Sequence, residues 1–354
     1  MTSKQRTLLA FTRREPDRVP IDYSANPGID GRLKAHFGLE NADHEGLLSA
    51  LSVDFRHVGA PYVGPELHHV PDDRRVDLWG ARSRWIEHAT GGYWDFCDFP
   101  LREATIDEVK VFPLPSPDDF DYSRVGAGCD TFPGRLIVAG GAGTPDIINS
   151  TGRVRSMEEV LVDLVTGEPI SFIYVDRKIE IQLEVLERTL KAADGRIDML
   201  GLGEDLGTQI GPMISLGLFR EVFRPRIQKF VDLAKRYDLL TMIHCCGSSS
   251  WAFDDFIDMG IDVVDTLQPE AKDMAPSYLK KRYGDRLSFH GAISTAGAVA
   301  TGSVADVVDE VKRTLEVMMS GGGYALAPTH QLQDNSPTEN VVAMYETALE
   351  AGSY

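Results

Sequence analysis

Three residues in the second half of the chain have side chains that commonly bind transition metals. His244 and Cys246 follow the apolar run LLTMI, and residues two apart in extended backbone point to the same side. An imidazole and a thiolate directed at one point suit zinc, and a catalytic zinc site uses about three protein ligands with one position open. His330 follows the run GYALAP and can supply the third ligand. We therefore predict a zinc site formed by His244, Cys246 and His330.

The segment HCCG also has a simpler interpretation, because free cysteine often behaves as a small buried apolar residue. On that alternative, residues 244–247 are a buried strand end with one hydrogen-bonded histidine. The four cysteines of the chain are too few and too unevenly placed for a disulfide framework. We expect reduced thiols, with Cys245 pointing away from Cys246 into the packing.

Other polar residues also fall where apolar runs end. Glu204 and Asp205 follow IDMLGLG, Asp265 and Gln268 follow IDVV, and His290 ends RLSF. Asp205 could act as a general acid, contact the substrate or lie behind the zinc ligands, whereas Glu204 could be a fourth, oxygen ligand. A loop carboxylate that caps the next helix is the alternative for this pair.

We expect four side chains to contact a substrate: Gln209, His290, Gln268 and Asp54. For His290, a hydrogen-bonded histidine in the core is the alternative.

These residues need a scaffold that gathers strand ends. From about residue 135, amphipathic stretches of helical length alternate with the apolar runs RLIVAGG, ISFIYVD, IDMLGLG, LLTMIHC, IDVVDTL, RLSFHGAIS and GYALAP. With the earlier run LSVDFRHVG they amount to eight strands, which favours a closed (β/α)8 TIM barrel over an open sheet. In such a barrel the carboxyl ends of all strands face one mouth, where active sites are built.

Local signals refine this prediction. Ser303 is expected to cap a helix that ends before Gly321, and Pro225 is expected to kink or divide the helical segment 216–237. Many prolines interrupt the first 130 residues, where WGARSRWIEHATGGYWDF predicts a hairpin. We interpret residues 1–354 as a single domain, with residues 1–130 forming the first barrel unit and an irregular, lid-like N-terminal extension.

Composition limits the partners. The 354 residues carry a net charge of −18, which repels nucleic acid and anionic membranes at long range. No apolar run approaches the length of about 18 residues that a membrane span needs, and no signal peptide is evident. We expect a cytoplasmic protein that binds small molecules.

An ordered series of motifs resembles one family over nearly the whole chain: REPDRVPIDY, VDFRHV, GEDLGTQ, IHCCG, DTLQPEAKDM, LKKRYGDRLSFHGAIS and GGYALAPTHQLQDNSPTENVVAMYETA. They are similar to the uroporphyrinogen decarboxylase superfamily, and within it to the corrinoid-dependent methyltransferase branch. This resemblance implies a barrel, a zinc ion, and a corrinoid (cobalamin) as methyl carrier. Because the chain lacks an Asp-x-His-x-x-Gly segment, the corrinoid is expected on a separate carrier protein.

Two departures from the family patterns bear on the substrate. Uroporphyrinogen decarboxylases carry an arginine-rich MRQAGR-like stretch near the N-terminus, where this chain has REPDRVPIDYSANPGIDGR. Methyl-corrinoid:coenzyme M methyltransferases have a later cysteine where this chain has His330. One thiolate with two imidazoles leaves a zinc ion net positive and therefore a better Lewis acid, which could polarise the ether oxygen of a methoxy compound.

The sequence thus predicts a zinc-dependent methyltransferase of the O-demethylase type, moving a methyl group between a small, for example methoxylated, substrate and a corrinoid. Two alternatives stay open. One is a decarboxylase-like lyase acting on a carboxylated ring compound through Asp54, Arg56 or Asp205. The other is a non-catalytic protein that binds a tetrapyrrole or corrinoid.

Overall fold

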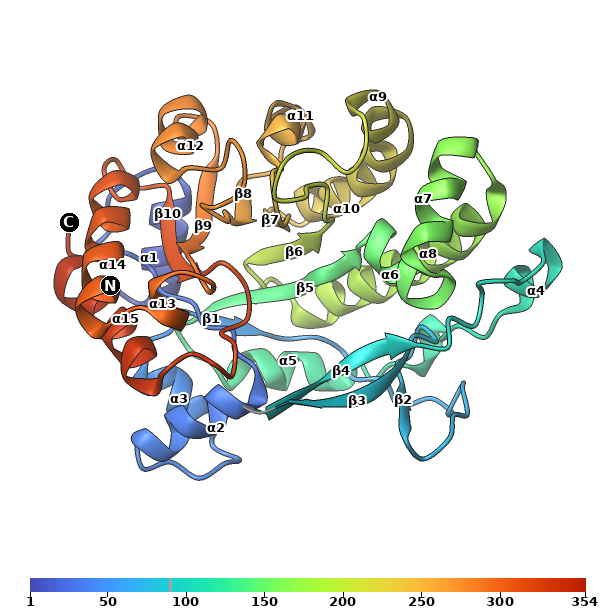
Figure 1. Ribbon diagram of the computed structural model, residues 1–354, viewed down its shortest axis with the longest axis horizontal. Coiled ribbons are helices and arrows are strands. Elements are labelled where there is room, and N and C mark those ends of the chain that lie inside the picture. The colour runs from blue at the N-terminus through green and yellow to red at the C-terminus, as the bar shows by residue number, and fades with distance from the viewer. Residues whose placement is uncertain (89–90) are drawn as a thin grey trace.

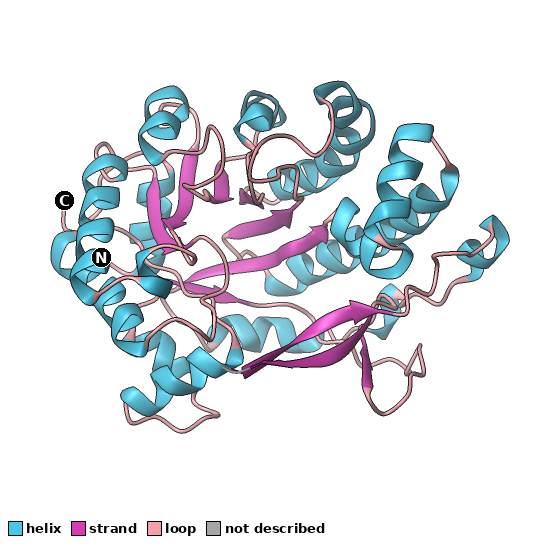
Figure 2. Ribbon diagram, in the orientation of Figure 1, coloured by secondary structure: helices cyan, strands magenta, loops and turns pink. Residues whose placement is uncertain are grey.

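The structure, a computed structural model, describes residues 1–88 and 91–354. Its centre is a curved sheet of seven strands in the order β1-β5-β6-β7-β8-β9-β10 (Figures 1 and 2). Each neighbouring pair is parallel, so the carboxyl ends of all seven lie along one edge. The strands are β1 (Phe55–His57), β5 (Leu136–Pro145), β6 (Met199–Gly203), β7 (Leu240–His244), β8 (Val263–Thr266), β9 (Ser288–Ile293) and β10 (Tyr324–Pro328).

Helices cover the outer face of this sheet (Figure 2). Strands β6, β9 and β10 are buried along their whole length, as expected for parallel strands covered on both faces. The α-helices are α1 (Ser3–Phe11), α2 (Pro27–His36), α3 (His44–Ala50), α4 (Ile106–Val111), α5 (Ser123–Asp130), α6 (Ile147–Arg155), α7 (Met157–Thr166), α8 (Pro169–Ala193), α9 (Leu216–Leu218), α10 (Arg224–Arg236), α11 (Phe253–Met259), α12 (Pro276–Tyr283), α13 (Ala298–Thr301), α14 (Val304–Met318) and α15 (Thr338–Ala351). Short 3-10 or π turns are η1 (Pro117–Asp119), η2 (Phe219–Phe223) and η3 (Ser250–Ala252).

Two helix signals read from the sequence are confirmed. The hydroxyl of Ser303 accepts a hydrogen bond from the backbone N–H of Asp306 and caps α14. The segment 216–237 is divided as expected, because the π turn η2 separates α9 from α10 and Pro225 lies in the first turn of α10. A proline there loses no hydrogen bond that the helix would otherwise make.

One predicted strand is wrong. The run ISFIYVD, residues 170–176, forms the first two turns of α8. Pro169 opens this helix, and its buried residues continue with helical spacing through Ser171, Tyr174, Lys178 and Gln182. A short apolar run does not distinguish a strand from a buried helical face, and here the spacing beyond residue 176 determines the outcome.

A short segment near the N-terminus, and not an eighth strand, lies between the two edges of this sheet. The backbone of residues 20–22 lies between the edge strands β10 and β1. Leu326 N–H donates to the Pro20 carbonyl (2.8 Å), Asp22 N–H donates to the Leu326 carbonyl (2.9 Å), and Asp54 N–H donates to the Ile21 carbonyl (2.8 Å). The prediction of a complete eight-stranded barrel is therefore confirmed only as a curled, parallel seven-stranded sheet. The segment makes one bridge, from Ile21 to Leu326 of β10, and accepts one hydrogen bond from Asp54, the residue before β1.

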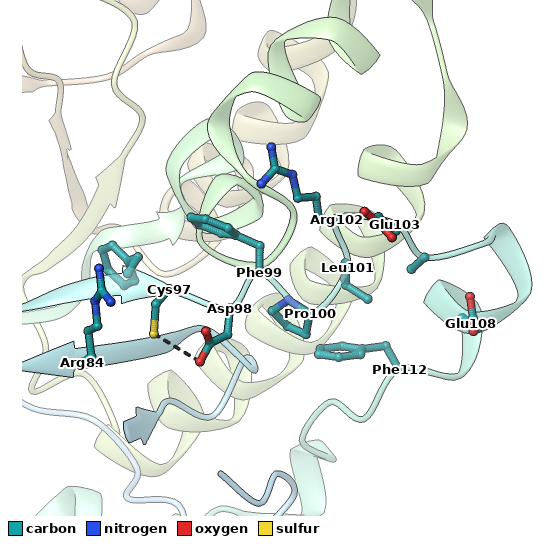
Figure 3. A pocket seen from close by; sticks show the side chains of 12 residues that line it. Arg84, Cys97, Asp98, Phe99, Pro100, Leu101, Arg102, Glu103, Glu108 and Phe112 are labelled. Carbon is teal, nitrogen blue, oxygen red and sulfur yellow. Dashed lines mark hydrogen bonds between the residues drawn. The ribbon is translucent and has the colours of Figure 1, made fainter. Parts of the chain in front are cut away.

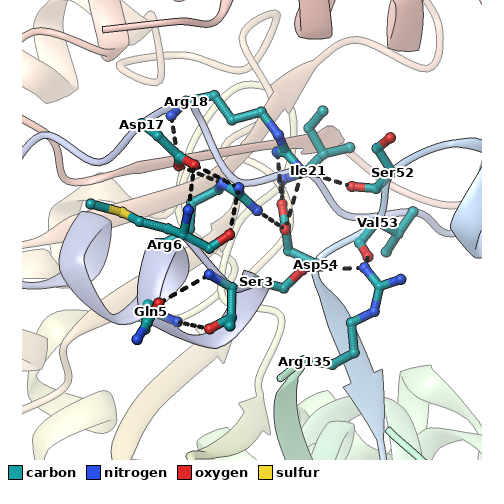
Figure 4. Close-up of polar contacts among 12 residues, drawn as sticks. Ser3, Gln5, Arg6, Asp17, Arg18, Ile21, Ser52, Val53, Asp54 and Arg135 are labelled. Atoms are coloured by element: carbon teal, nitrogen blue, oxygen red, sulfur yellow. Dashed lines mark hydrogen bonds and ion pairs between the residues drawn. The ribbon is translucent and has the colours of Figure 1, made fainter. Parts of the chain in front are cut away.

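Beneath the sheet, at the amino end of β1, a buried ionic cluster fastens α1 to the fold (Figure 4). The fully buried carboxylate of Asp54 accepts hydrogen bonds from Arg6 (2.8 Å), Arg18 (2.9 Å) and the Ile21 backbone (2.9 Å). Arg6 also donates to Asp17 at 2.7 Å. The arginines and the backbone amide thus satisfy a charge that would be costly to bury alone.

A separate antiparallel sheet is formed by β2 (Arg74–Val76), β3 (Arg82–His88) and β4 (Gly91–Cys97). The pairing of β3 with β4 confirms the predicted hairpin, whose connection lies outside the described residues. Beside it lies a cavity of about 790 Å³ in which Cys97 contacts Asp98 (Figure 3). Within the described residues, no helix combines the length and apolarity needed to cross a membrane.

Candidate active site

A cavity of about 550 Å³ opens where the strands of the large sheet end. Its side chains come from β1, from β5 to β10, from the loops and the helix α6 that follow them, and from residues 22–24 of the N-terminal segment. The ionisable side chains of its lining are Asp22, His57, Asp146, Arg153, Glu204, Asp205, His244, Asp265, His290 and His330. A concave site with a few convergent polar groups is the usual form of a small-molecule site.

His244, Cys246 and His330 converge in this region. His244 ends β7, Cys246 lies two residues later, and His330 lies two residues after the end of β10. One ligand atom from each lies within 4.8 Å of the others. The Cys246 Sγ is 3.3 Å from His244 Nε2, and the two imidazole rings are 6.2 Å apart between centroids. The side chains that were predicted as zinc ligands are thus neighbours in space.

Asp265 on β8 fixes the orientation of His244. The Nδ1 atom of His244 lies 2.6 Å from one oxygen of Asp265. If Nδ1 carries the proton, it donates to this carboxylate and leaves the Nε2 lone pair directed toward Cys246. A carboxylate that accepts a hydrogen bond from the other ring nitrogen is the usual support of a metal-binding imidazole.

The same carboxylate holds His290 on β9. His290 Nδ1 lies 2.6 Å from the other oxygen of Asp265, and His290 Nε2 lies 3.1 Å from Asp22. Burial opposes protonation of this imidazole, but Asp265 and Asp22 outweigh it and raise the pKa of His290 to about 10. Burial likewise opposes ionisation of Asp265, yet the two histidines hold its pKa well below the ordinary value. His290 therefore lies in the cavity wall as a protonated partner of two carboxylates.

Asp205, in the loop after β6, also contacts the zinc-ligand candidates. Its Oδ1 accepts the backbone N–H of Cys246 at 2.8 Å, and its Oδ2 accepts the Asn149 amide N–H at 2.8 Å. The Oδ1 atom is also 3.9 Å from His244 Nε2. Asp205 thus lies beside the ligand candidates, and its role as general acid, substrate contact or supporting group stays a prediction.

Glu204 has a different role from the one expected. Its two oxygens accept the backbone N–H groups of Ile147 (2.6 Å) and Ile148 (3.1 Å) at the start of α6. Burial, reinforced by the nearby Asp146, raises its pKa well above the ordinary value. In the described part of the chain it does not belong to the group of converging ligand atoms. Glu204 thus anchors the N-terminus of an earlier helix, α6, and not that of the next helix as in the capping alternative.

Three of the expected substrate contacts lie outside the cavity lining. Asp54 is in the buried cluster at the amino end of β1, on the side of the sheet away from the strand carboxyl ends. Gln209 is exposed on a loop, where its carbonyl accepts the N–H of Lys272. Gln268 is half-buried and its carbonyl accepts the N–H of Ala271. Of the four, the structure brings only His290 to the cavity.

Sequence reasoning missed a group of cavity residues on and before α6. Asp146, Asn149 and Arg153 share one side of this helix and line the cavity. Burial raises the pKa of Asp146 to about 6, although the nearby Arg153 acts in the opposite direction. The available signal was that Asp146 follows directly on β5, as Glu204 follows on β6. The strand was predicted only to residue 141, whereas β5 continues to Pro145.

The residues of the cluster fit a zinc ion. Two imidazoles and one thiolate are ligands that zinc prefers, and three protein ligands leave a position for substrate. Ligand atoms bound to one zinc at 2.0–2.3 Å lie roughly 3–4 Å apart, so separations within 4.8 Å need only small side-chain rotations. The Asp265 contact supplies the supporting layer that such sites have.

The fold is that of an α/β protein with a polar cavity at the carboxyl edge of a curled parallel sheet. The model of the uroporphyrinogen decarboxylase (URO-D) family matches residues 175–351, which is half of the chain. The chain belongs to the uroporphyrinogen decarboxylase family. The matched half contains His244, Cys246 and His330.

Comparison with solved structures extends the likeness over the rest of the chain. A structure described as a methyltransferase from Methanosarcina mazei superposes with a TM-score of 0.64 at 17% sequence identity, covering 99% of each chain. At this identity the match establishes a common fold. A D-psicose 3-epimerase solved with D-fructose matches with a TM-score of 0.36 at 13% identity, over 70% of this chain and 84% of that one. This match is too weak to indicate a common fold. A search of curated proteins found no match.

Proposed function

We propose that the protein is a zinc-dependent methyltransferase that moves a methyl group between a small substrate and a corrinoid carried by a partner protein. The observation that carries this proposal is the convergence of His244, Cys246 and His330 on one side of the cavity, with Asp265 supporting His244. A methyltransferase of the same fold gives it further support.

In this proposal the chain's own residues bind the zinc ion, orient the substrate and transfer a proton. His244, Cys246 and His330 would hold the zinc, and Asp265 would keep His244 Nε2 directed at it. Bound zinc would supply a net positive Lewis acid that polarises the oxygen of a methoxy group. When the methyl group passes to the reduced corrinoid of the partner protein, the C–O bond breaks, its electron pair stays on the oxygen, and the oxygen must take up a proton from solvent. Asp205, whose Oδ1 is 3.9 Å from His244 Nε2, would take this proton from solvent and pass it to the oxygen.

The alternative of a decarboxylase-like lyase acting through Asp54, Arg56 or Asp205 has less support. Asp54 is saturated by Arg6 and Arg18, and Arg56 donates to Glu45 at 2.6 and 2.7 Å. Neither side chain lines the cavity. Only Asp205 of that set remains available for chemistry.

The first experiment measures metal content per chain for the native protein, for His330→Ala and for His57→Ala. His57 lines the same cavity but is outside the ligand cluster, so it is a matched control. We expect about one zinc in the native chain and in His57→Ala, and much less in His330→Ala. Equal metal content in all three proteins, or no metal in any of them, would contradict the proposed site.

The second experiment supplies methoxylated donors and free cob(I)alamin to the zinc-loaded protein, and follows methyl transfer by the change in corrinoid absorbance. We expect transfer by the native chain and its loss in His330→Ala. If no donor gives transfer in the native chain, the methyltransferase proposal fails. Zinc binding without any turnover would then favour the non-catalytic binding protein.

A further inference from the structure

We propose that a second pocket, at the amino ends of β1 and β5, binds a phosphate group and that Arg135 is the residue that holds it. This pocket has a volume of about 390 Å³. Arg135 directly precedes β5, so the pocket lies at the opposite end of the strands from the candidate active site. The inference goes beyond the proposed function and depends on neither zinc nor methyl transfer.

The charge of this pocket is opposite to that of the chain. Its charged side chains are those of Arg6, Arg18 and Arg135, and none of its described lining residues is a carboxylate. The chain as a whole has a net charge of −18. Positive charge gathered in a concave site raises the local concentration of anions. The pocket therefore favours an anionic ligand.

Arg135 differs from the other two arginines in having no counterion. Arg6 and Arg18 both donate to the buried Asp54, at 2.8 and 2.9 Å (Figure 4), whereas Arg135 forms no ion pair with any described residue. Burial lowers the pKa of Arg135, and the neighbouring Arg56 guanidinium acts in the same direction, although nearby carboxylates oppose both effects. An anion bound beside this half-buried cation would stabilise its charged form.

The guanidinium of Arg135 is held in place at one nitrogen atom only. Its Nη1 atom donates to the Ser3 hydroxyl (3.2 Å) and to the Val53 carbonyl (2.9 Å). In the described part of the chain, its Nε and Nη2 atoms make no hydrogen bond. These two atoms form the edge of an arginine that can bind two oxygens of a phosphate side by side. Arg135 is thus oriented by the protein and has donors available for a ligand.

Hydroxyl groups surround the arginines. Thr2, Ser3, Ser49 and Ser52 line the same pocket, and the nine-residue helix α1 begins there at Ser3. The positive end of its dipole adds to the attraction for an anion. A phosphate has three or more strong acceptor oxygens, so it can bind arginine and hydroxyl donors together. A volume of about 390 Å³ is near the lower limit of ligand sites, which suits phosphate or a small phosphate monoester.

The test titrates inorganic phosphate, glycerol 3-phosphate and acetate into the full chain by calorimetry, in chloride buffer of constant ionic strength. We expect phosphate to bind with a Kd of about 1 mM or tighter, and acetate, which has fewer acceptor oxygens and less charge, to bind about 10-fold more weakly. Arg135→Gln should weaken phosphate binding about 10- to 100-fold, as the loss of a charged hydrogen bond predicts. Arg135→Lys keeps the charge but loses the fork, and should give an intermediate loss.

Arg102→Gln is the matched control, because it changes the net charge equally but removes an arginine from the cavity of Figure 3. It should bind phosphate as the native chain does. A second measurement uses the native chain alone, so it remains decisive if Arg135→Gln does not fold. Phosphate should slow the modification of Arg135 by phenylglyoxal, located by peptide mass spectrometry, and leave the modification of Arg102 unchanged.

Several results would overturn the site: no binding of phosphate to the native chain, undiminished affinity in Arg135→Gln, acetate bound as tightly as phosphate, or equal protection of Arg102 and Arg135. Tighter binding of glycerol 3-phosphate than of inorganic phosphate would uphold the site and identify a phosphate monoester as its ligand. The reverse order would uphold it and identify free phosphate. Zinc content and methyl transfer are measured separately, so a failure of the proposed function would leave this site standing.

Discussion

Asp265 links two parts of the site through a single carboxylate. One of its oxygens contacts His244 and the other contacts His290, both at 2.6 Å. An amide at this position could still accept one N–H, but its NH₂ group would oppose the second imidazole N–H. The identity of this residue therefore determines whether His244 and His290 keep their orientations together.

For Asp265→Asn we expect zinc affinity to fall about 10- to 100-fold, the usual effect of losing a partner of a metal-binding histidine. Competition with a chromophoric chelator measures this affinity. Asp262→Asn is a suitable control, because Asp262 accepts hydrogen bonds from Thr241 and lies outside the cavity lining. An unchanged affinity in Asp265→Asn would remove Asp265 from the site's support.

His290 should make stability depend on pH. Its pKa in the folded chain, about 10, is above the ordinary value of 6.5, so its stabilising contribution is fully present below about pH 6.5. The contribution is lost as the pH rises through the folded value. We expect the difference in free energy of unfolding between metal-free native protein and His290→Gln to shrink from pH 6.5 to 10. A difference that is constant over this range would contradict the charged pairing with Asp265 and Asp22.

At the scale of elements, apolar runs ending in polar residues were sufficient to predict seven strands and the convergence of three ligand candidates. The zinc-ligand candidates were identifiable because each lies at the carboxyl end of a strand or two residues beyond it. Parallel topology then brings these strand ends together. Gln209 and Gln268 did not reach the cavity because their loops are shaped by backbone hydrogen bonds that no side-chain pattern encodes.

The segment beside β10, residues 20–22, could not be predicted for a physical reason. Segment 20–22 bonds to its neighbours at single points and contains Pro20, so it has no run of alternating residues to mark it. The run 170–176 filled the expected count instead, since its apolar residues are compatible with either a strand or a buried helix. Arg153 was missed because the end of β5 was placed too early.

The cavity-lining glycines of β5 give a prediction about this element. Gly143→Val adds a side chain where a Cβ meets no atom within 4 Å, so the chain should fold with little change in melting temperature. The new methyl groups would occupy part of the cavity and raise KM for a methoxylated substrate. Methyl-transfer kinetics with a methoxylated donor measure the loss. An unaltered KM in a folded Gly143→Val protein would mean that the substrate does not lie against this strand.

At the scale of the whole molecule, the buried cluster of Figure 4 fastens the N-terminal helix beneath the sheet. Asp54→Ala would leave the positive charges of Arg6 and Arg18 without their buried carboxylate partner. Removing one partner of a buried ion pair typically costs about 3–5 kcal/mol. Denaturant unfolding should show this loss in free energy of unfolding, with a smaller effect for the half-exposed Asp17→Ala. Zinc content per folded chain should stay unchanged. A loss of zinc from folded Asp54→Ala would show that the cluster acts on the cavity.

The bridging position of residues 20–22 has a consequence for how the chain is made. Ile21 pairs with Leu326, roughly 300 residues later. A ribosome adding about 5–20 residues per second would release the last strand on the order of 15 to 60 seconds after the first segment emerges. Throughout that interval the nascent sheet has an unpaired edge, which is a surface prone to association with other chains. We therefore expect this chain to depend on a chaperone more strongly during synthesis than during refolding of the finished chain.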